Sequence, residues 1–358
     1  MNIDNIFFEL IQVAIGNRIC LSHSPTAEEW KALYEIAKKQ SLVGVCFAGV
    51  QRLQTQRQEP PEMLYLTWMG MAAKIQQRNE TVNRQCAQLG ERLKAEGYSY
   101  SILKGQGVGQ VYPEHLRGLR QSGDIDVYVQ GGMKAVMQWV RKYCPEAEGD
   151  YVHTHMNMFV DTDVEVHYKY GLLYNLWMNH KLQKWFDGQQ EHEEIALGDG
   201  YICVPAPQFN ALYLMLHTYR HLFAEGVGLR QIMDYYCFLK THGSSIDKDV
   251  LLAQVKEFGM QRFAGALMWV MKTVFDCPDT LLVCQPNENE GRYLLDSVMA
   301  GGNFGHGNRK EGNRSHMKIM ADMVKHSLHM SMHYGQEALW APIWHVYHFF
   351  WKRTSGRV

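Results

Sequence analysis

The chain has 358 residues, of which 46% are hydrophobic and 20% charged, so it can bury a large core as an ordinary globular protein. Its 36 basic and 37 acidic side chains give a formal net charge of −1, which disfavours a large RNA or DNA partner. The sequence has no secretory signal pattern, no apolar run near the ~18 residues of a membrane span, and eight scattered cysteines without a CxxC pair. These features predict a cytoplasmic protein with reduced thiols and no membrane segment.

Residues 1–97 predict an N-terminal helical subdomain, because apolar residues recur there at helical spacing. Thr26 lies in a Ser-Pro-Thr sequence that is typical of a helix start. Pro60-Pro61 begins a longer helix that runs to Leu93, and Gly97 is placed to end it in the left-handed conformation.

Residues 98–205 predict a core in which strands and helices alternate. The expected strands are 98–103, 125–129, 151–160 and 164–168, with a helix near 133–143. Because the connection from Asp161 to Asp163 is short and polar, the last two strands are expected to form a hairpin.

Residues 206–358 predict a C-terminal helical domain. The expected helices are 209–223, 229–239, 250–258, 263–275 and 339–351. The stretch 285–315 is rich in Gly and Asn and predicts a mobile surface loop. The whole pattern predicts an α+β fold with an α/β-like core between two helical subdomains.

The most informative motif is Asp124-Ile125-Asp126, which lies in a short apolar stretch with strand character. Alternate side chains of a strand share one face, so the two carboxylates are expected about 7 Å apart on the same side. Such a pair suits Mg²⁺, which bridges carboxylates to substrate phosphates. The alternative is that both aspartates lie on the solvent side of an edge strand.

A metal site for nucleotidyl transfer usually needs a third carboxylate, and Glu165 is the candidate. In Val164-Glu165-Val166-His167 the valines can face the core while Glu165 and His167 share the opposite face. A strand beside Asp124 and Asp126 would direct Glu165 to the same cations, with His167 nearby to orient a carboxylate.

These motifs resemble a known family. Leu103-Lys104-Gly105, Ser122-Gly123-Asp124-Ile125-Asp126 and Val164-Glu165-Val166-His167 together look like the bacterial uncharacterised nucleotidyltransferase family of the nucleotidyltransferase-fold superfamily, over residues 100–240. The resemblance implies a mixed sheet flanked by helices, with Asp124, Asp126 and Glu165 holding Mg²⁺ or Mn²⁺. One departure is that the usual Gly-Gly or Gly-Ser element about ten residues before the Asp pair is missing in standard form. Gly105 precedes Asp124 by nineteen positions.

Five residues are expected to bind the nucleoside triphosphate (NTP). Lys104 can reach a phosphate as a point charge, and the turn at Gly105 can offer backbone N–H groups. The Arg120 guanidinium matches phosphate geometry, and Ser122 and Gly123 directly precede the acidic pair. The alternative for Lys104 and Arg120 is an ordinary solvated surface role.

His217 and His221 are four residues apart, which places them on one helical face. Position 218 is Thr, so the glutamate of a metalloprotease HExxH helix is missing. These histidines, with Arg230 and Asp234, are expected either to face the active cleft or to form a buried structural network.

The sequence therefore predicts a Mg²⁺-dependent nucleotidyltransferase that moves a nucleoside monophosphate from an NTP to an acceptor hydroxyl and releases pyrophosphate. The alternatives are a non-catalytic binding protein with the same fold and a metal-dependent phosphohydrolase that uses the same carboxylates. The acceptor is expected to be a small molecule or a protein in preference to a nucleic acid. The sequence does not predict the oligomeric state.

Overall fold

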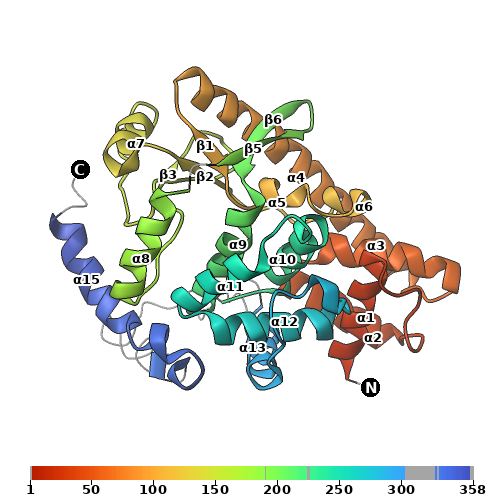
Figure 1. Ribbon diagram of the computed structural model, residues 1–358. Helices are drawn as coiled ribbons and strands as arrows, with labels where there is room; N and C mark the ends of the chain where they lie inside the picture. The colour runs from red at the N-terminus through yellow and green to blue at the C-terminus, as the bar shows by residue number, and fades with distance from the viewer. Residues whose placement is uncertain (1, 190, 224–225, 303–326, 329, 355–358) are drawn as a thin grey trace, which may run out of the picture.

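The computed structural model describes residues 2–189, 191–223, 226–302, 327–328 and 330–354, which form a mixed α+β fold as expected (Figure 1). Its longer helices are α1 Ile3–Ile15, α2 Ala27–Lys39, α3 Val43–Leu53, α4 Glu62–Ala95, α7 Gly132–Arg141, α8 Leu176–Asp187, α9 Pro207–Phe223, α10 Leu229–His242, α11 Lys248–Glu257, α12 Gln261–Phe275, α13 Glu288–Gly301 and α15 Ala341–Thr354. Short turns are η1 Gln54–Gln56, α5 Gln106–Gly109, α6 Glu114–Arg117 and η2 Asp279–Leu281. Within these described ranges, none of the helices combines the length and apolar character needed to cross a membrane.

Four strands form the central sheet, in the order β1-β2-β4-β3. They are β1 Tyr100–Ile102, β2 Ile125–Val129, β3 His153–Met156 and β4 Val164–His167. The inner strands β2 and β4 run parallel, and each outer strand is antiparallel to its neighbour, so the sheet is mixed. A separate hairpin pairs β5 His192–Leu197 with β6 Gly200–Pro205. The parallel pair β2 and β4 is the part of the sheet that carries the acidic residues.

The N-terminal helices begin and end where the sequence predicts. Thr26 caps α2 through a capping box with Glu29. Gly97 follows α4 with φ of +79°, and the Tyr98 N–H donates to the Leu93 carbonyl, so the chain leaves α4 through the left-handed turn that glycine permits. The long helix α4 then crosses the molecule beside the sheet (Figure 1).

Two large apolar clusters hold these elements together. One lies between the sheet and helices α4 and α7, with Val82, Val127 and Val140 fully buried. The other joins the N-terminal helices to the helices after the sheet, because side chains such as Phe7 of α1 and Met271 of α12 belong to the same buried cluster. The helices from both ends of the sequence therefore share one core and together support the sheet.

Several elements differ from the sequence-based expectations. The strand expected at 151–160 is β3, which ends at Met156, so the β3–β4 connection covers residues 157–163. Helix α8 and the hairpin β5–β6 were not predicted. The stretch 285–315 was expected to contain a surface loop, but the helix α13 in its first half, which Asn287 caps, was not predicted. Residues 303–315 lie outside the described residues, so the loop stays a prediction.

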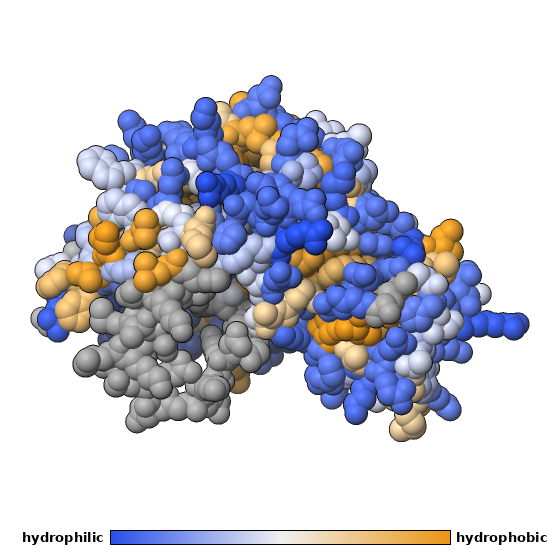
Figure 2. Space-filling view, turned by 90° about the horizontal axis from the view of Figure 1, so that it is seen from below, coloured by the Kyte–Doolittle hydropathy of each residue, from blue (hydrophilic) through white to orange (hydrophobic). Residues whose placement is uncertain are grey.

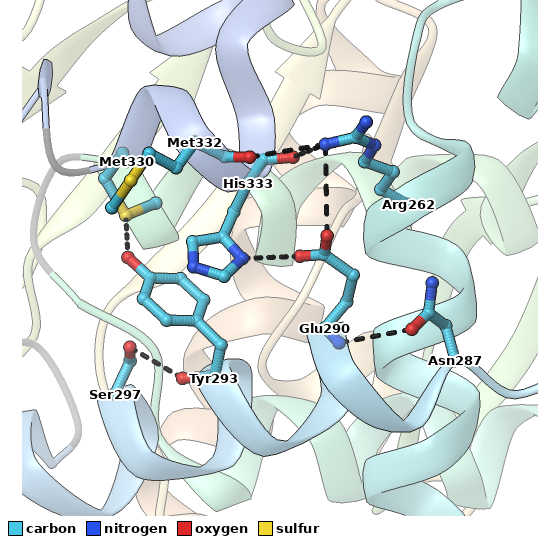
Figure 3. A network of polar contacts seen from close by, with 8 residues as sticks. All are labelled: Arg262, Asn287, Glu290, Tyr293, Ser297, Met330, Met332 and His333. Atoms are coloured by element: carbon cyan, nitrogen blue, oxygen red, sulfur yellow. Dashed lines mark hydrogen bonds and ion pairs between the residues drawn. The ribbon is translucent and has the colours of Figure 1, made fainter.

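Residues 330–338 are helical and pack against α12 and α13 through a network of polar contacts (Figure 3). His333 Nδ1 lies 2.8 Å from Glu290 Oε2, and Arg262 Nη1 donates to the backbone carbonyl of His333. The His333 ring also stacks on Tyr293. This network fixes the segment that carries the buried Glu337.

On the face shown in Figure 2, hydrophobic side chains lie in separate patches among mostly hydrophilic ones.

Candidate metal and nucleotide site

Three carboxylates meet at one end of the parallel strands β2 and β4. Asp126 pairs with Glu165 in the β2–β4 register, and Asp124 lies immediately before β2. Ile125 and Val127 alternate with the aspartates and are buried in the core, which directs both carboxylates to the opposite side. One carboxylate oxygen from each of Asp124, Asp126 and Glu165 lies within 4.8 Å of the others. The structure thus brings together the three residues that the sequence singles out.

Asp126 is the most buried of the three and contacts two cationic or polar side chains. Lys104, which follows β1, places Nζ 2.6 Å from Asp126 Oδ1. His167 Nε2 lies 3.1 Å from the same oxygen and 3.5 Å from Glu165 Oε2. The backbone holds this arrangement, because the Leu103 N–H donates to the Asp126 carbonyl. Lys104 and His167 therefore offset part of the negative charge of the carboxylates.

The electrostatics of this cluster favour a cation. The charge of Asp126, with burial as the second cause, raises the pKa of Asp124 to about 6. Burial also raises the pKa of Glu165, but the hydrogen bond from His167 and the charge of Lys104 outweigh it, so the Glu165 pKa is lowered. Because Asp124 and Asp126 repel each other while Glu165 stays ionised, a divalent cation among their oxygens would relieve the repulsion. The oxygen-only donor set fits Mg²⁺ or Mn²⁺.

Four of the five residues predicted to bind NTP line a small recess beside the carboxylates, and Ser122 does not. Its lining includes Lys104, Gly105, Arg120, Gly123 and Arg230. Gly105 has a φ of +54°, which an L side chain rarely adopts, so the turn after β1 depends on glycine. The oxygen atom Oγ of Ser122 is buried without a hydrogen-bond partner among the described residues. The recess is therefore lined by three cationic side chains and by three carboxylates, those of Asp124, Asp126 and Asp234.

Arg120 is mainly engaged in a buried ion pair. Its Nε and Nη2 atoms each donate to Asp234 at 2.7 Å, and the Tyr112 hydroxyl also donates to Asp234. Arg120 Nη1 is buried and has no hydrogen-bond partner in the described part of the chain. Only this nitrogen remains for a phosphate oxygen, so Arg120 has a structural role beside any role in nucleotide binding.

On the other side of Lys104 and Asp124 lies a larger cleft of about 330 Å³. Its volume is within the range of small-molecule sites, roughly 300–1,000 Å³. His217 and His221 of α9 line it, with ring centroids 4.3 Å apart, so both histidines face the cleft. Burial, with the Lys104 charge as the second cause, lowers the pKa of His221 to about 3 and that of His217 well below its usual value. Both are neutral imidazoles at pH 7.

Aromatic side chains form the far wall of this cleft. Tyr151 contacts Trp344 of α15 edge to face, at 4.8 Å between ring centroids, and Tyr174 lies beside Trp344 at 6.4 Å. The Arg220 guanidinium lies over the Tyr174 ring, and His348 approaches Asp150 at 2.5 Å. The cleft thus has an acidic end at β2 and β4 and an aromatic end at α15.

Sequence reasoning did not identify the aromatic wall or assign a role to His153. Trp344 is far along the chain from the acidic motifs, and only tertiary packing brings α15 to the cleft. His153 pairs directly with His167 across the β3–β4 ladder, a register that the sequence alone does not specify. The four-residue spacing of Tyr213, His217 and His221 was a usable signal for one cleft-facing helical face.

Comparison with known proteins agrees with the motifs. Residues 26–276 match a family described as uncharacterised nucleotidyltransferase. No curated protein matches the chain. Among solved structures, the chain is similar to an antigenic nucleotidyltransferase-like protein from Paracoccidioides brasiliensis, with 11% identity, a TM-score of 0.35, and coverage of 60% of this chain and 96% of that one. The family match covers most of the chain and includes all three carboxylates, so the protein belongs to the uncharacterised nucleotidyltransferase family.

Proposed function

We propose that the protein transfers a nucleoside monophosphate from an NTP to a hydroxyl group of a small molecule, with Mg²⁺ or Mn²⁺ as cofactor and pyrophosphate as the second product. The observation that carries the proposal is the convergence of Asp124, Asp126 and Glu165 around the Lys104 ammonium, at the border of the recess and the larger cleft. The alternative phosphohydrolase would use the same carboxylates, but no feature of the cleft favours water as the acceptor.

Asp124, Asp126 and Glu165 would hold the divalent cation, which when bound supplies charge neutralisation for the phosphates of the NTP. The Lys104 ammonium, now 2.6 Å from Asp126, would exchange this carboxylate for a phosphate oxygen as the substrate enters. The turn at Gly105 and Arg120 Nη1 lie at the recess beside Lys104. The volume of this recess, about 40 Å³, leaves room for the oxygens of one phosphate group, so the rest of the triphosphate would lie in the larger cleft. These groups bind and orient the phosphates.

In the transfer step the acceptor oxygen forms a bond to the α-phosphorus, and the bond from that phosphorus to the pyrophosphate oxygen breaks. The hydroxyl proton needs an acceptor within the cleft. Glu165, which lines the larger cleft, would accept this proton or complete the cation site, while Asp124 and Asp126 would hold the cation. Asp124 also lines both the recess and the larger cleft, so it adjoins both substrates.

The aromatic cleft is the proposed acceptor site. Tyr151, Tyr174 and Trp344 offer ring faces and edges, while Arg220 and Asp150 offer charged groups at the same end. Aromatic side chains with a few convergent polar groups are typical of sites for small molecules. A cleft of about 330 Å³ with aromatic walls fits a small acceptor that carries a ring, whereas a protein acceptor would insert only one side chain.

The proposal is tested by incubating the purified protein with each α-³²P-labelled NTP, Mg²⁺ and a small-molecule extract. The wild type is expected to transfer label and release pyrophosphate, and Asp126→Ala is expected to lose at least about 100-fold in rate, because the carboxylate acts on the transition state. Asp163→Ala is the matched control, since this exposed aspartate lies beside the same strands but outside the cluster.

Other results would decide against the proposal. Release of inorganic phosphate from the γ position without label transfer would identify a phosphohydrolase. Binding of NTP without turnover in any extract or with either metal would identify a non-catalytic binding protein. Equal activity of the wild type and Asp126→Ala would remove the carboxylate cluster from the mechanism.

A further inference from the structure

A second group of potential metal ligands lies next to the carboxylate cluster and contains nitrogen. His153 of β3 and His167 of β4 face each other directly in the antiparallel register, and Glu165 precedes His167 by two residues on the same face. One ligand atom from each of His153, Glu165 and His167 lies within 4.8 Å of the others. The ring centroids of the two histidines are 5.0 Å apart.

His167 is arranged as metal-binding histidines usually are. Its Nε2 atom lies 3.1 Å from Asp126 Oδ1, so this nitrogen is held by a carboxylate. Its Nδ1 atom is buried and has no hydrogen-bond partner among the described residues, although the residue is only 6% exposed. Buried polar atoms normally have partners, and a histidine ligand commonly donates its other ring N–H to a carboxylate. Nε2 therefore contacts Asp126 and also lies 3.5 Å from Glu165 Oε2, while Nδ1 is the ring nitrogen without a partner among the described residues.

We propose that His153, Glu165 and His167 bind a transition-metal ion of the Zn²⁺ type, separate from the Mg²⁺-type ion of the three carboxylates. Imidazole nitrogen suits Zn²⁺, Co²⁺ and similar ions, whereas Mg²⁺ prefers oxygen ligands only. Two imidazoles and one carboxylate leave an open coordination position, which is the pattern of catalytic zinc sites. All three residues line the larger cleft, so the open position would face bound small molecules.

The two proposed ions would share Glu165. A carboxylate between two cations is a feature of two-metal centres, in which the ions are about 3.5–4 Å apart. The inference concerns metal binding and goes beyond nucleotidyl transfer, so it is tested without NTP or acceptor. Failure of the transfer reaction would leave this test unaffected.

The experiment is a titration of the untagged, metal-free, full-length protein with Co²⁺, followed by visible absorption, and with Zn²⁺ by equilibrium dialysis in millimolar Mg²⁺. We expect one equivalent of Co²⁺ to give the intense visible bands of a site with fewer than six ligands, and Zn²⁺ to remain bound despite the Mg²⁺. His153→Asn is expected to weaken Zn²⁺ binding at least about tenfold. Even the loss of a residue that only hydrogen-bonds to a metal ligand lowers metal affinity roughly 10–100-fold, and His153 is proposed as a ligand itself.

His155→Asn is the matched control. His155 lies on the same strand and face, and its ring contacts that of His153, but it is exposed and outside the three-residue group. This variant is expected to bind Zn²⁺ as the wild type does. Zinc X-ray absorption spectra should show scattering from two imidazole rings in the wild type and from one in His153→Asn.

Three results would overturn the inference. The first is that millimolar Mg²⁺ abolishes Zn²⁺ binding. The second is that the wild type and His153→Asn bind Zn²⁺ with the same affinity. The third is that His153→Asn and His155→Asn lose equal amounts of Zn²⁺ affinity. Circular dichroism of each variant ensures that only folded protein is compared. If His153→Asn does not fold, His153→Gln replaces it, because its longer amide keeps more of the side-chain volume.

Discussion

Lys104 Nζ lies 2.6 Å from Asp126 Oδ1, and this ion pair connects the segment after β1 to the beginning of β2. The Asp126 side chain is only 3% exposed, and burial alone would lower the pKa of Lys104. The charge of Asp126 outweighs that effect, so the Lys104 pKa is raised and the ammonium stays charged in the cleft. The pair therefore keeps both charges satisfied in the free protein, and under the proposed function the Lys104 ammonium would move from Asp126 to a substrate phosphate.

Asp126→Asn is expected to lower the free energy of unfolding by less than the roughly 3 kcal/mol of an orphaned buried charge, because Lys104 loses its closest partner but keeps Asp124 and Glu165 nearby, and the repulsion between Asp126 and Asp124 is relieved. In this background, Lys104→Met is expected to restore part of the loss, with a coupling energy of about 0.5–3 kcal/mol. Urea unfolding of the wild type, both single variants and the double variant measures the cycle. Strictly additive effects would show that the two side chains do not stabilise each other.

The carboxylate cluster was predictable because it depends on local patterns. Asp124 and Asp126 flank Ile125, and Glu165 and His167 flank Val166, so strand alternation alone places each pair on one face. Gly97 was equally predictable as the end of α4, because it needs only a local backbone conformation.

Contacts between distant segments could not be predicted in the same way. Arg120 looks like a phosphate ligand in the sequence, but its partner Asp234 is 114 positions away and is brought to it by the packing of α10. Trp344 reaches the cleft only through the packing of α15. Helix α13 was missed because the Asn and Gly content of its sequence outweighed its apolar spacing, although Asn287 is a good N-cap.

Glu337 predicts a pH dependence of stability. Its carboxylate accepts hydrogen bonds from the backbone N–H groups of Tyr174 and Asn175, which line or adjoin the aromatic end of the cleft. Burial raises the Glu337 pKa from 4.5 to about 7, so the folded protein holds this proton more tightly than the unfolded chain does. Its contribution is therefore fully present below pH 4.5 and is lost as the pH rises towards 7, by about 3 kcal/mol in total.

The comparison of the wild type with Glu337→Gln isolates this contribution from the histidines that titrate in the same range. The difference in free energy of unfolding between the two proteins, measured by urea unfolding at pH 5 and at pH 8, should shift by up to about 3 kcal/mol in favour of the variant at pH 8. A difference that is constant between these pH values would contradict the raised pKa.

The ion pair between Arg120 and Asp234 lines the small recess beside the carboxylates, and it is expected to contribute much of the stability there. Asp234→Asn should lower the free energy of unfolding by about 3–5 kcal/mol, because it leaves a buried guanidinium without its carboxylate. Tyr112→Phe removes only the hydroxyl donor to the same carboxylate, so a smaller loss of about 1 kcal/mol is expected. Thermal and urea unfolding measure both variants, and similar losses for the two would show that charge is not the main factor.

Trp344 is expected to act on the acceptor and not on the nucleotide, because it lies at the aromatic end of the cleft, away from Lys104 and the recess. Trp344→Ala should lower transfer of label from α-³²P-labelled NTP to the extract acceptor at least about tenfold, since loss of a well-packed aromatic contact costs roughly 2 kcal/mol or more. The Kd for a fluorescent NTP analogue in Mg²⁺ should stay within about twofold of the wild type. This corresponds to a change of about 0.4 kcal/mol or less in the free energy of nucleotide binding. Phe350→Ala is the control, since this side chain is on the same helix but 59% exposed. A parallel loss of nucleotide binding in Trp344→Ala would instead assign the aromatic wall to the NTP base.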